Sequence, residues 1–298
     1  MLGEWRILDC SRMEGRITAS RGSVVIEACD RPPVRVPMAD VACVLIGYRV
    51  GLSGGALHHL TAGGAAVLLC DWRGVPEAGA YAWSEHSRIG ARRAAQARLS
   101  LPRQKAAWQR IVREKVLNQA RTLDLTGGDG GALVELAKKV RSGDPDNIEG
   151  RAASEYWKRL CSEDFRRRMH TEVGFNGMLD YAYTVGRGHA VRAVLAAGLE
   201  PSIGVHHRHR ENMFCLADDF IEIVRPVIDY HVWSLWSDGV MSVDEGRQAL
   251  VAAASAPYSA DGYTVPTALE MLAQAFGQYV EGQKEKLDVP RWTAWVET

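Results

Sequence analysis

The chain of 298 residues is 47% hydrophobic and 24% charged, which is typical of a globular protein. Lysine plus arginine equals aspartate plus glutamate, at 36 each, so the net charge gives no sign of a polyanionic partner. No stretch approaches the ~18 uncharged apolar residues of a membrane span, and Trp5, Arg6 and Asp9 interrupt any secretory signal. The six cysteines are scattered without a C-x-x-C pair, so we expect reduced thiols in a cytoplasmic protein without membrane contact.

Short apolar runs rich in β-branched residues, separated by Gly, Pro and Asp, dominate the chain up to about residue 80. These runs are Val24–Ile26, Val34–Val36, Val41–Ile46 and Ala65–Cys70. Beyond them the apolar residues recur at helical spacing. We therefore predict an α+β protein with three parts: a small β-rich N-terminal domain at residues 1–83, a linker at 84–95 and a larger all-α domain at 96–298.

A strongly basic stretch runs from Arg88 to Arg121, where ten Lys or Arg residues accompany one acid, Glu114. Apolar residues recur at helical spacing within it, so we predict an ordered basic helix rather than a tail. One-sided positive charge favours contact with nucleic-acid phosphates, although a solvated helix face would show the same pattern. The candidate DNA-contacting side chains, including two from a second basic cluster, are Arg88, Arg92, Arg93, Arg103, Arg110, Arg166 and Arg167.

A stretch with several possible metal ligands spans residues 198–222. Gly and Pro residues punctuate its first part as a turn, and apolar spacing predicts a helix in its last part. Acids three and four residues apart share one helix face, where they repel unless a cation lies between them. Imidazoles plus carboxylates form a ligand set for a divalent metal, although helix-capping acids and structural histidines would look the same. The residues concerned are His206, His207, His209, Asp218, Asp219 and Glu222.

A further candidate carboxylate is Glu149, which follows two possible helix caps, Asp146 and Asn147. It would then lie in the first helical turn, where a surface carboxylate is also favoured by the helix dipole. Small residues follow at Gly150 and Ala152, which suits the close approach of another element or a ligand.

Three stretches carry a family resemblance when they are taken in order. They are Asn147-Ile-Glu-Gly-x-Ala-Ala-x-x-Tyr-Trp157, Asn176 to Tyr183, and Gly198-Leu-x-Pro-x-x-Gly-x-x-His207 followed by Leu216-Ala-Asp-Asp-x-Ile-Glu222. Together they resemble the CRISPR-associated spacer integrase, the first of the Cas families and the catalytic subunit of CRISPR adaptation. The resemblance covers nearly the whole chain, and that family has the same order of a β-rich front and a helical back, which implies that the all-α domain at 96–298 is the catalytic, DNA-binding one. The run Lys115–Ala120 is similar to the form found in type II systems, which have a single large nuclease.

The resemblance implies four catalytic residues: a metal triad of Glu149, His207 and Glu222, with Asp219 as a further acid near the metal. It implies Mg²⁺ or Mn²⁺, which suits carboxylate and imidazole ligands without a thiolate. The implied reaction is attack by the 3′-hydroxyl of a short DNA fragment on a phosphodiester of the CRISPR repeat. Arg225 matches a family position and joins the candidate DNA-binding set, although Glu222-Ile-Val-Arg225 replaces the frequent Glu-Pro-Phe-Arg.

The resemblance also implies partners. They are double-stranded DNA, both as fragment and as repeat target, and a small ferredoxin-like dimer that takes part in adaptation. Because one active site joins one DNA end, we expect a homodimer, with the N-terminal domain as its dimerisation surface. The large effector nuclease stays open as a further partner.

Three other interpretations use the same residues. The chain could be a stand-alone metal-dependent nuclease on branched or single-stranded DNA, with water as the nucleophile. It could be a non-catalytic DNA-binding scaffold in which the acids only cap helices. A zinc hydrolase built on His206, His207 and His209 is disfavoured, because three histidines within four residues do not easily converge on one ion from a single loop.

Overall fold

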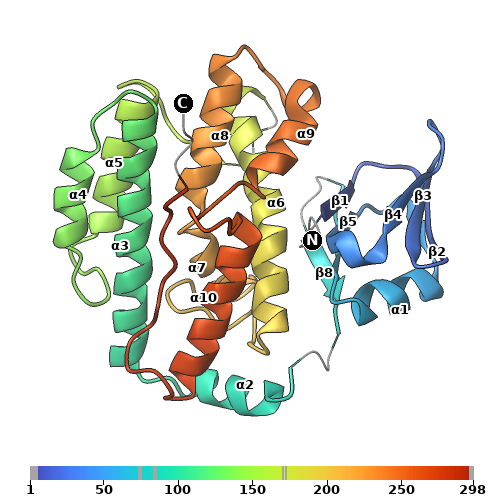
Figure 1. Cartoon of the computed structure of the whole chain (residues 1–298), viewed down its shortest axis with the longest axis horizontal. Coiled ribbons are helices and arrows are strands. Elements are labelled where there is room, and N and C mark those ends of the chain that lie inside the picture. Colours follow the sequence, from blue (N-terminus) through green and yellow to red (C-terminus); the bar gives the residue numbers. More distant parts are fainter. Residues whose placement is uncertain (1–5, 73–75, 83–85, 170, 172, 295–298) are drawn as a thin grey trace. The chain divides into compact units, whose positions relative to one another are not determined.

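The chain divides into two compact units, an N-terminal unit at residues 1–87 and a helical unit at residues 88–298 (Figure 1). The first is β-rich and the second consists of helices, which confirms the predicted α+β class. The expected linker at 84–95 needs correction, because Arg88 and the residues after it belong to the helical unit; residues 83–85 lie outside the described residues. The structure is a computed structural model that describes residues 6–72, 76–82, 86–169, 171 and 173–294.

Two four-stranded sheets make up the described strands of the N-terminal unit. The first contains, in order, β1 (Arg6–Cys10), β5 (Val41–Ile46), β7 (Ala66–Cys70) and β8 (Pro76–Ala80). The second contains, in order, β4 (Val34–Pro37), β3 (Ser23–Ala28), β2 (Gly15–Ser20) and β6 (Val50–Leu52). β5 is parallel to both β1 and β7, whereas β8 is antiparallel to β7. In the second sheet β3 is antiparallel to both neighbours, and β6 is parallel to β2.

Each predicted apolar run overlaps one of these strands, which confirms that part of the prediction. All six positions of β5 are buried, as expected of a strand with parallel neighbours and two covered faces. A short 3₁₀ helix (Met38–Asp40) precedes β5. Helix α1 (Gly54–Ala62) begins after Ser53, whose hydroxyl accepts a hydrogen bond from the N–H of Ala56 at 3.1 Å.

Two long helices, α3 and α6, organise the helical unit. α3 contacts α4, α5 and α8, while α6 contacts α7, α8, α9 and α10. No helix within the described ranges is both long and apolar enough to cross a bilayer. The bounds are α2 (Ile89–Ala97), α3 (Leu101–Leu125), α4 (Gly131–Lys138), α5 (Ile148–Leu160), α6 (Gly174–Ala196), α7 (Cys215–Ile221), α8 (Arg225–Ser237), α9 (Val243–Ala253) and α10 (Val265–Val280).

The basic stretch Arg88–Arg121 is two helices, not the single helix that we predicted. α2 ends at Ala97, and α3 begins with Pro102 in its first turn. Proline has no N–H to donate, and its fixed φ suits the first turn of a helix, so the chain starts a new helix there instead of continuing the old one.

Candidate active site

Glu149 lies in the first turn of α5, which a local cap holds in place. Asn147 has the left-handed backbone (φ 50°), and its side chain accepts a hydrogen bond from the N–H of Gly150 at 3.3 Å, which confirms it as a cap. The carboxylate of Asp144 accepts a second hydrogen bond, from the N–H of Glu149 at 2.9 Å. Asp146, the other predicted cap, forms an exposed ion pair instead. The α5 start is therefore fixed by side chains, and Glu149 with it.

Glu222 lies at the junction of two helices, directly after the last residue of α7. The next helix, α8, starts at Arg225 with Pro226 in its first turn, so this proline begins a helix rather than kinking one. The Glu222 side chain is only 3% exposed, with Oε1 2.8 Å from Arg225 Nη1 and Oε2 2.5 Å from Lys115 Nζ. Burial raises the pKa of Glu222, but Arg225 and Lys115 outweigh burial and lower the pKa to about 2. This buried carboxylate is therefore ionised at neutral pH.

Lys115 of α3 joins the two predicted acids, and our sequence analysis did not single it out as a site residue. Its Nζ lies 2.6 Å from Glu149 Oε1 and 2.5 Å from Glu222 Oε2. Burial lowers the pKa of Lys115, but the two carboxylates outweigh burial and raise the pKa above its ordinary value. A sequence signal was present: Lys115 lies four residues after Ile111 and three after Val112, on the buried face of the helix. A lysine on such a face requires an acidic partner.

Asp219 holds the loop that carries His207. Its side chain is fully buried, and its oxygens accept hydrogen bonds from the backbone N–H groups of Val205, His206 and His207. Asp219 Oδ1 also lies 2.7 Å from His207 Nδ1, and this hydrogen bond raises the pKa of His207. Because a carboxylate only accepts, Nδ1 carries the proton, and Nε2 of the neutral ring keeps its lone pair. Asp219 therefore positions the ring and the loop of His207.

The histidine loop packs tightly against its surroundings. A Cβ atom on Gly204 would lie 2.5 Å from the carbonyl oxygen of His207 and 2.8 Å from Asp219 Oδ2, so only glycine fits there. The His206 ring stacks on Trp108 with centroids 4.3 Å apart. His206 is thus held against α3, whereas His207 is held by Asp219.

The residues present fit a divalent ion in part. Within the described residues, no three His, Cys, Asp or Glu side chains form a ready-made metal cluster. Glu149 and Glu222 nevertheless converge on one cation, the ammonium of Lys115, and Glu222 is near enough to His207 for the imidazole charge to lower its pKa. Glu222 Oε2, although buried, makes no hydrogen bond of acceptable geometry. Its partner at this oxygen is the ammonium of Lys115 at 2.5 Å, and a metal ion ligated by the same oxygen would take the place of that ammonium.

The family model described as CRISPR associated protein Cas1 matches residues 11–250. The chain belongs to the Cas1 family. The CRISPR-associated endonuclease Cas1 of Neisseria meningitidis serogroup C (strain 8013) is 36% identical over 233 residues, which make up 77% of this chain and 76% of that protein.

Two solved structures share the Cas1 fold of this chain. A casposase bound to integration product has a TM-score of 0.77 at 18% identity, over 99% of this chain and 95% of the other. A Cas6-RT-Cas1–Cas2 complex has a TM-score of 0.73 at 19% identity, over 99% of this chain and 36% of that longer one. At these identities the likeness is one of fold.

Arg92, one of the predicted DNA-contacting residues of this Cas1-family chain, is buried instead. It is 5% exposed, and its guanidinium donates to the carbonyl of Ala197 at 2.6 Å and to Gln274 Oε1 at 2.9 Å. It also pairs with Glu281, at 3.3 Å. These acceptors lie about a hundred or more residues away in the chain, so the local charge pattern could not reveal them. Arg92 is a packing residue, which corrects its assignment.

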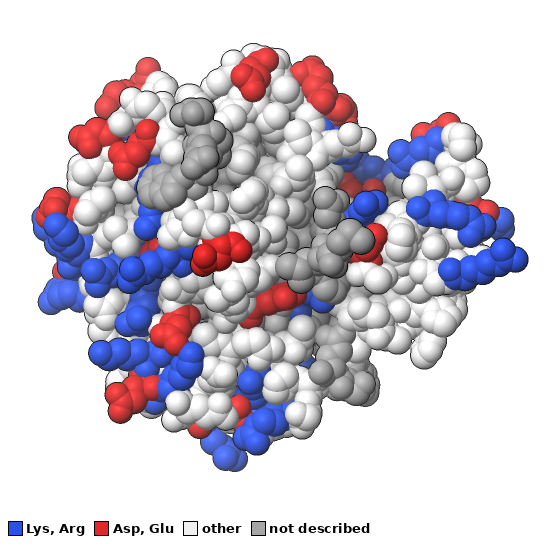
Figure 2. Space-filling view, in the orientation of Figure 1, with Lys and Arg blue, Asp and Glu red and all other residues white. Residues whose placement is uncertain are grey.

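Several other predicted arginines also have internal acceptors. Arg103 donates to the carbonyls of Tyr279 (2.5 Å) and Lys284 (3.0 Å), and Arg225 is bound to Glu222. On the visible face of the helical unit, acidic side chains lie along the upper edge, and basic side chains gather at the left and below, with acidic ones among them (Figure 2). The remaining pairs are Arg88 with Glu281, Arg93 with Glu200, Arg110 with the carbonyl of Leu287, Arg166 with the carbonyls of Glu163 and Phe165, and Arg167 with Asp180. Of the predicted set, Arg88, Arg110 and Arg166 are exposed.

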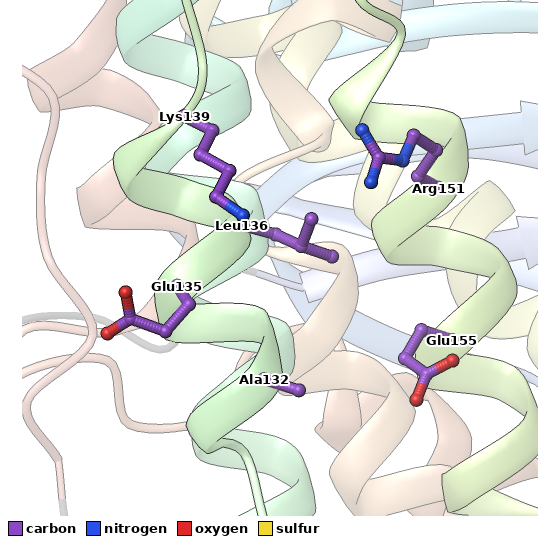
Figure 3. A pocket seen from close by; sticks show the side chains of 6 residues that line it. All are labelled: Ala132, Glu135, Leu136, Lys139, Arg151 and Glu155. Atoms are coloured by element: carbon purple, nitrogen blue, oxygen red, sulfur yellow. The ribbon is translucent and has the colours of Figure 1, made fainter.

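A cavity of about 420 Å³ opens beside His207, and Arg208 and Arg210 are among its lining residues. The histidines of this loop were expected site residues, but the arginines between them were not, although they alternate with histidine in the sequence. A second cavity, of about 400 Å³, lies between α4 and α5 (Figure 3). It is lined by Leu136 and by charges of both signs and contains none of the predicted site residues. The cavity beside His207 is therefore the one connected with the site.

Proposed function

We propose that this Cas1-family chain is a metal-dependent DNA integrase and endonuclease of CRISPR adaptation. The 3′-hydroxyl oxygen of a short DNA fragment attacks a phosphodiester of the repeat, so that a new P–O ester bond forms, the existing one breaks, and the cut repeat strand leaves with a free 3′-hydroxyl. The observation that carries the proposal is the convergence of Glu149 and Glu222 on one cation position, the ammonium of Lys115. The charge of His207 also acts on Glu222, whose pKa it lowers. The relatives support it, since the meningococcal protein is named an endonuclease and the casposase is bound to an integration product.

Glu149, Glu222 and His207 would hold Mg²⁺ or Mn²⁺, because two carboxylates and one imidazole without a thiolate suit these ions. When bound, the ion supplies Lewis-acid polarisation of the scissile phosphate. Asp219 keeps the proton of His207 on Nδ1, so Nε2 of the neutral ring has a free lone pair with which to ligate the ion. Arg225 keeps Glu222 ionised and therefore able to bind a cation.

The DNA backbone would be bound by the arginines beside His207. Arg208 and Arg210 line the cavity there, and guanidinium groups pair well with phosphate. Insertion of both ends of a fragment requires two active sites, so the proposal includes a homodimer formed through the N-terminal unit. It also includes a small ferredoxin-like partner, which is supported by the neighbouring structure that contains Cas2.

An integration assay tests this proposal. The full chain is incubated with Mn²⁺, a DNA fragment with free 3′-hydroxyl ends and a supercoiled plasmid carrying a CRISPR repeat, with and without the small partner. We expect joined products from the parent chain and none from Glu149→Gln or His207→Ala. Lys138→Met is the matched control, because Lys138 pairs with Glu135 on the exposed surface. A fragment ending in a 3′-deoxynucleotide should give no product.

The possible outcomes separate the alternatives. If His207→Ala joins the DNA fragment to the plasmid at the parent rate, then His207 is not a ligand of the ion. Cleaved fragments without joined products would identify a stand-alone nuclease. Calorimetry that detects no saturable Mn²⁺ binding, together with DNA binding but no reaction, would identify a non-catalytic scaffold.

A further inference from the structure

Lys115 is held beside the two acids by the packing of its helix. Three residues further along α3, the Asn118 side chain donates a hydrogen bond to the carbonyl of Ile223 at 2.8 Å. One turn beyond, the Thr122 hydroxyl donates to the carbonyl of Pro226, also at 2.8 Å. These two contacts fasten α3 to the segment that carries Glu222. The Lys115 ammonium is therefore presented to Glu222 by a helix that is hydrogen-bonded to the same segment.

The charges around Lys115 balance only while no divalent ion is bound. Lys115 and Arg225 carry two positive charges, and Glu149 and Glu222 carry two negative ones. A divalent ion on the same carboxylates would leave the group with a net charge of +2 and Lys115 without an anion of its own. A buried ammonium without a partner is unfavourable, so it requires another anion. A DNA phosphate is the anion that the proposed reaction brings to this place.

We propose that Lys115 exchanges between two anionic partners. It pairs with Glu149 and Glu222 in the ion-free protein, and it pairs with the phosphate of bound DNA once a divalent ion occupies the carboxylates. The inference rests on the proposed function, because it uses that ion and that substrate. Lysine suits such an exchange, since its ammonium is a compact charge on a flexible stem, whereas an arginine fork would remain on a carboxylate.

The exchange makes two properties of Lys115→Met move in opposite directions. Removing the ammonium removes the competitor for the carboxylates, so calorimetry with Mn²⁺ should give a dissociation constant at least about tenfold lower than that of the parent. At saturating Mn²⁺, joining of DNA should be at least about tenfold slower, because the phosphate loses its cation. A lysine with only a structural role would weaken both properties together. Lys138→Met should change neither.

A second measurement uses the parent chain and so does not depend on the folding of a variant. Lysines are methylated with formaldehyde and a borane reductant, and the extent at each lysine is read by mass spectrometry. Lys115 should be protected in the ion-free chain, react at least about threefold faster with Mn²⁺, and become protected again when DNA is added with Mn²⁺. Lys138, which is exposed, should react equally in all three states.

Either of two results overturns the exchange: weaker Mn²⁺ binding by Lys115→Met, or Lys115 methylation that does not respond to Mn²⁺. These results leave the proposed function in place if the parent chain binds Mn²⁺ and Glu149→Gln does not. If neither the parent nor Lys115→Met binds Mn²⁺, both proposals fail. If only Lys115→Met binds it, the competition by Lys115 is supported directly.

Discussion

The hydroxyl of Tyr156 lies 2.9 Å from Oδ2 of Asp229, and the hydroxyl of Tyr183 donates to the other oxygen of the same carboxylate. Asp229 belongs to α8 and is 2% exposed. Burial raises its pKa to about 6, although the two hydroxyls act in the lowering direction. The contact links α5, which starts with Glu149 in its first turn, to α8, which starts with Arg225.

We expect Asp229→Asn to reduce the pH dependence of stability. The folded protein keeps a proton on Asp229 up to about pH 6, whereas the unfolded chain releases it near the ordinary pKa of 3.8, so stability falls as the pH rises through this window. The full shift corresponds to roughly 3 kcal/mol. Asparagine remains neutral and can bond both hydroxyls. In urea unfolding between about pH 4 and 7, the free energy of unfolding of the variant should therefore rise relative to that of the parent as the pH rises. A difference that stays constant with pH would contradict the raised pKa.

Binding of Mn²⁺ should strengthen as the pH rises through the pKa of His207. The hydrogen bond to Asp219 raises this pKa above the ordinary 6.5, and a protonated imidazole cannot bind a metal. Below the pKa, affinity should fall by up to about tenfold per pH unit. Calorimetry across about pH 6 to 8.5 measures the midpoint, and Asp219→Asn should lower it. An affinity that is flat over this range would exclude His207 as a ligand.

The α5 cap should contribute to both stability and ion binding. Asn147→Ala loses the capping hydrogen bond and places alanine at a positive φ, so we expect a cost of about 2 kcal/mol in urea unfolding. Asn147→Gly also loses the hydrogen bond but tolerates the backbone, so it should cost less. Mn²⁺ affinity should fall in the same order, because Glu149 is held by this turn. Equal stability of the two variants would show that the left-handed backbone carries no strain.

The arginines beside His207 should make DNA binding more sensitive to salt. Each phosphate neutralised contributes about 0.9 to the slope of log affinity against log salt. The double variant Arg208→Ala, Arg210→Ala should therefore reduce the slope by up to about 2. Arg31→Ala, an exposed arginine of the N-terminal unit, is the matched control. An unchanged slope in the double variant would mean that this cavity does not contact the DNA backbone.

Patterns among residues close in the chain were sufficient to predict the strands of the N-terminal unit and the start of helix α5. The apolar run Val41–Ile46 has the same bounds as β5, because a strand buried on both faces leaves an unbroken apolar run in the sequence. Asn147 was recognisable as a cap because capping uses residues close in the chain. The resemblance to the spacer integrase supplied the four acidic and histidine site residues, and the family match confirms that resemblance.

Long-range partners could not be read from the sequence. The charge count around Arg92 suggested an exposed basic helix, but its acceptor Glu281 lies 189 residues further along the chain. Asp219 was expected near the metal, and its oxygens also accept hydrogen bonds from backbone N–H groups of the histidine loop. Because the donors are backbone groups, no pattern of side chains in the sequence predicts these hydrogen bonds. The burial of Lys115 was indicated by its place on the apolar face of α3, but its two partners were not, since they come from the start of α5 and from the junction after α7.

The saturated hydrogen bonding of Asp219 has a kinetic consequence. The loop that presents the imidazole is held in one shape by the protein's own groups, because one carboxylate satisfies three of its amides and its ring. Binding of an ion then requires only the Lys115 side chain to move away from the carboxylates, and no segment of the chain has to become ordered. Loading should accordingly be rapid, on the timescale of rotamer changes and not of loop folding.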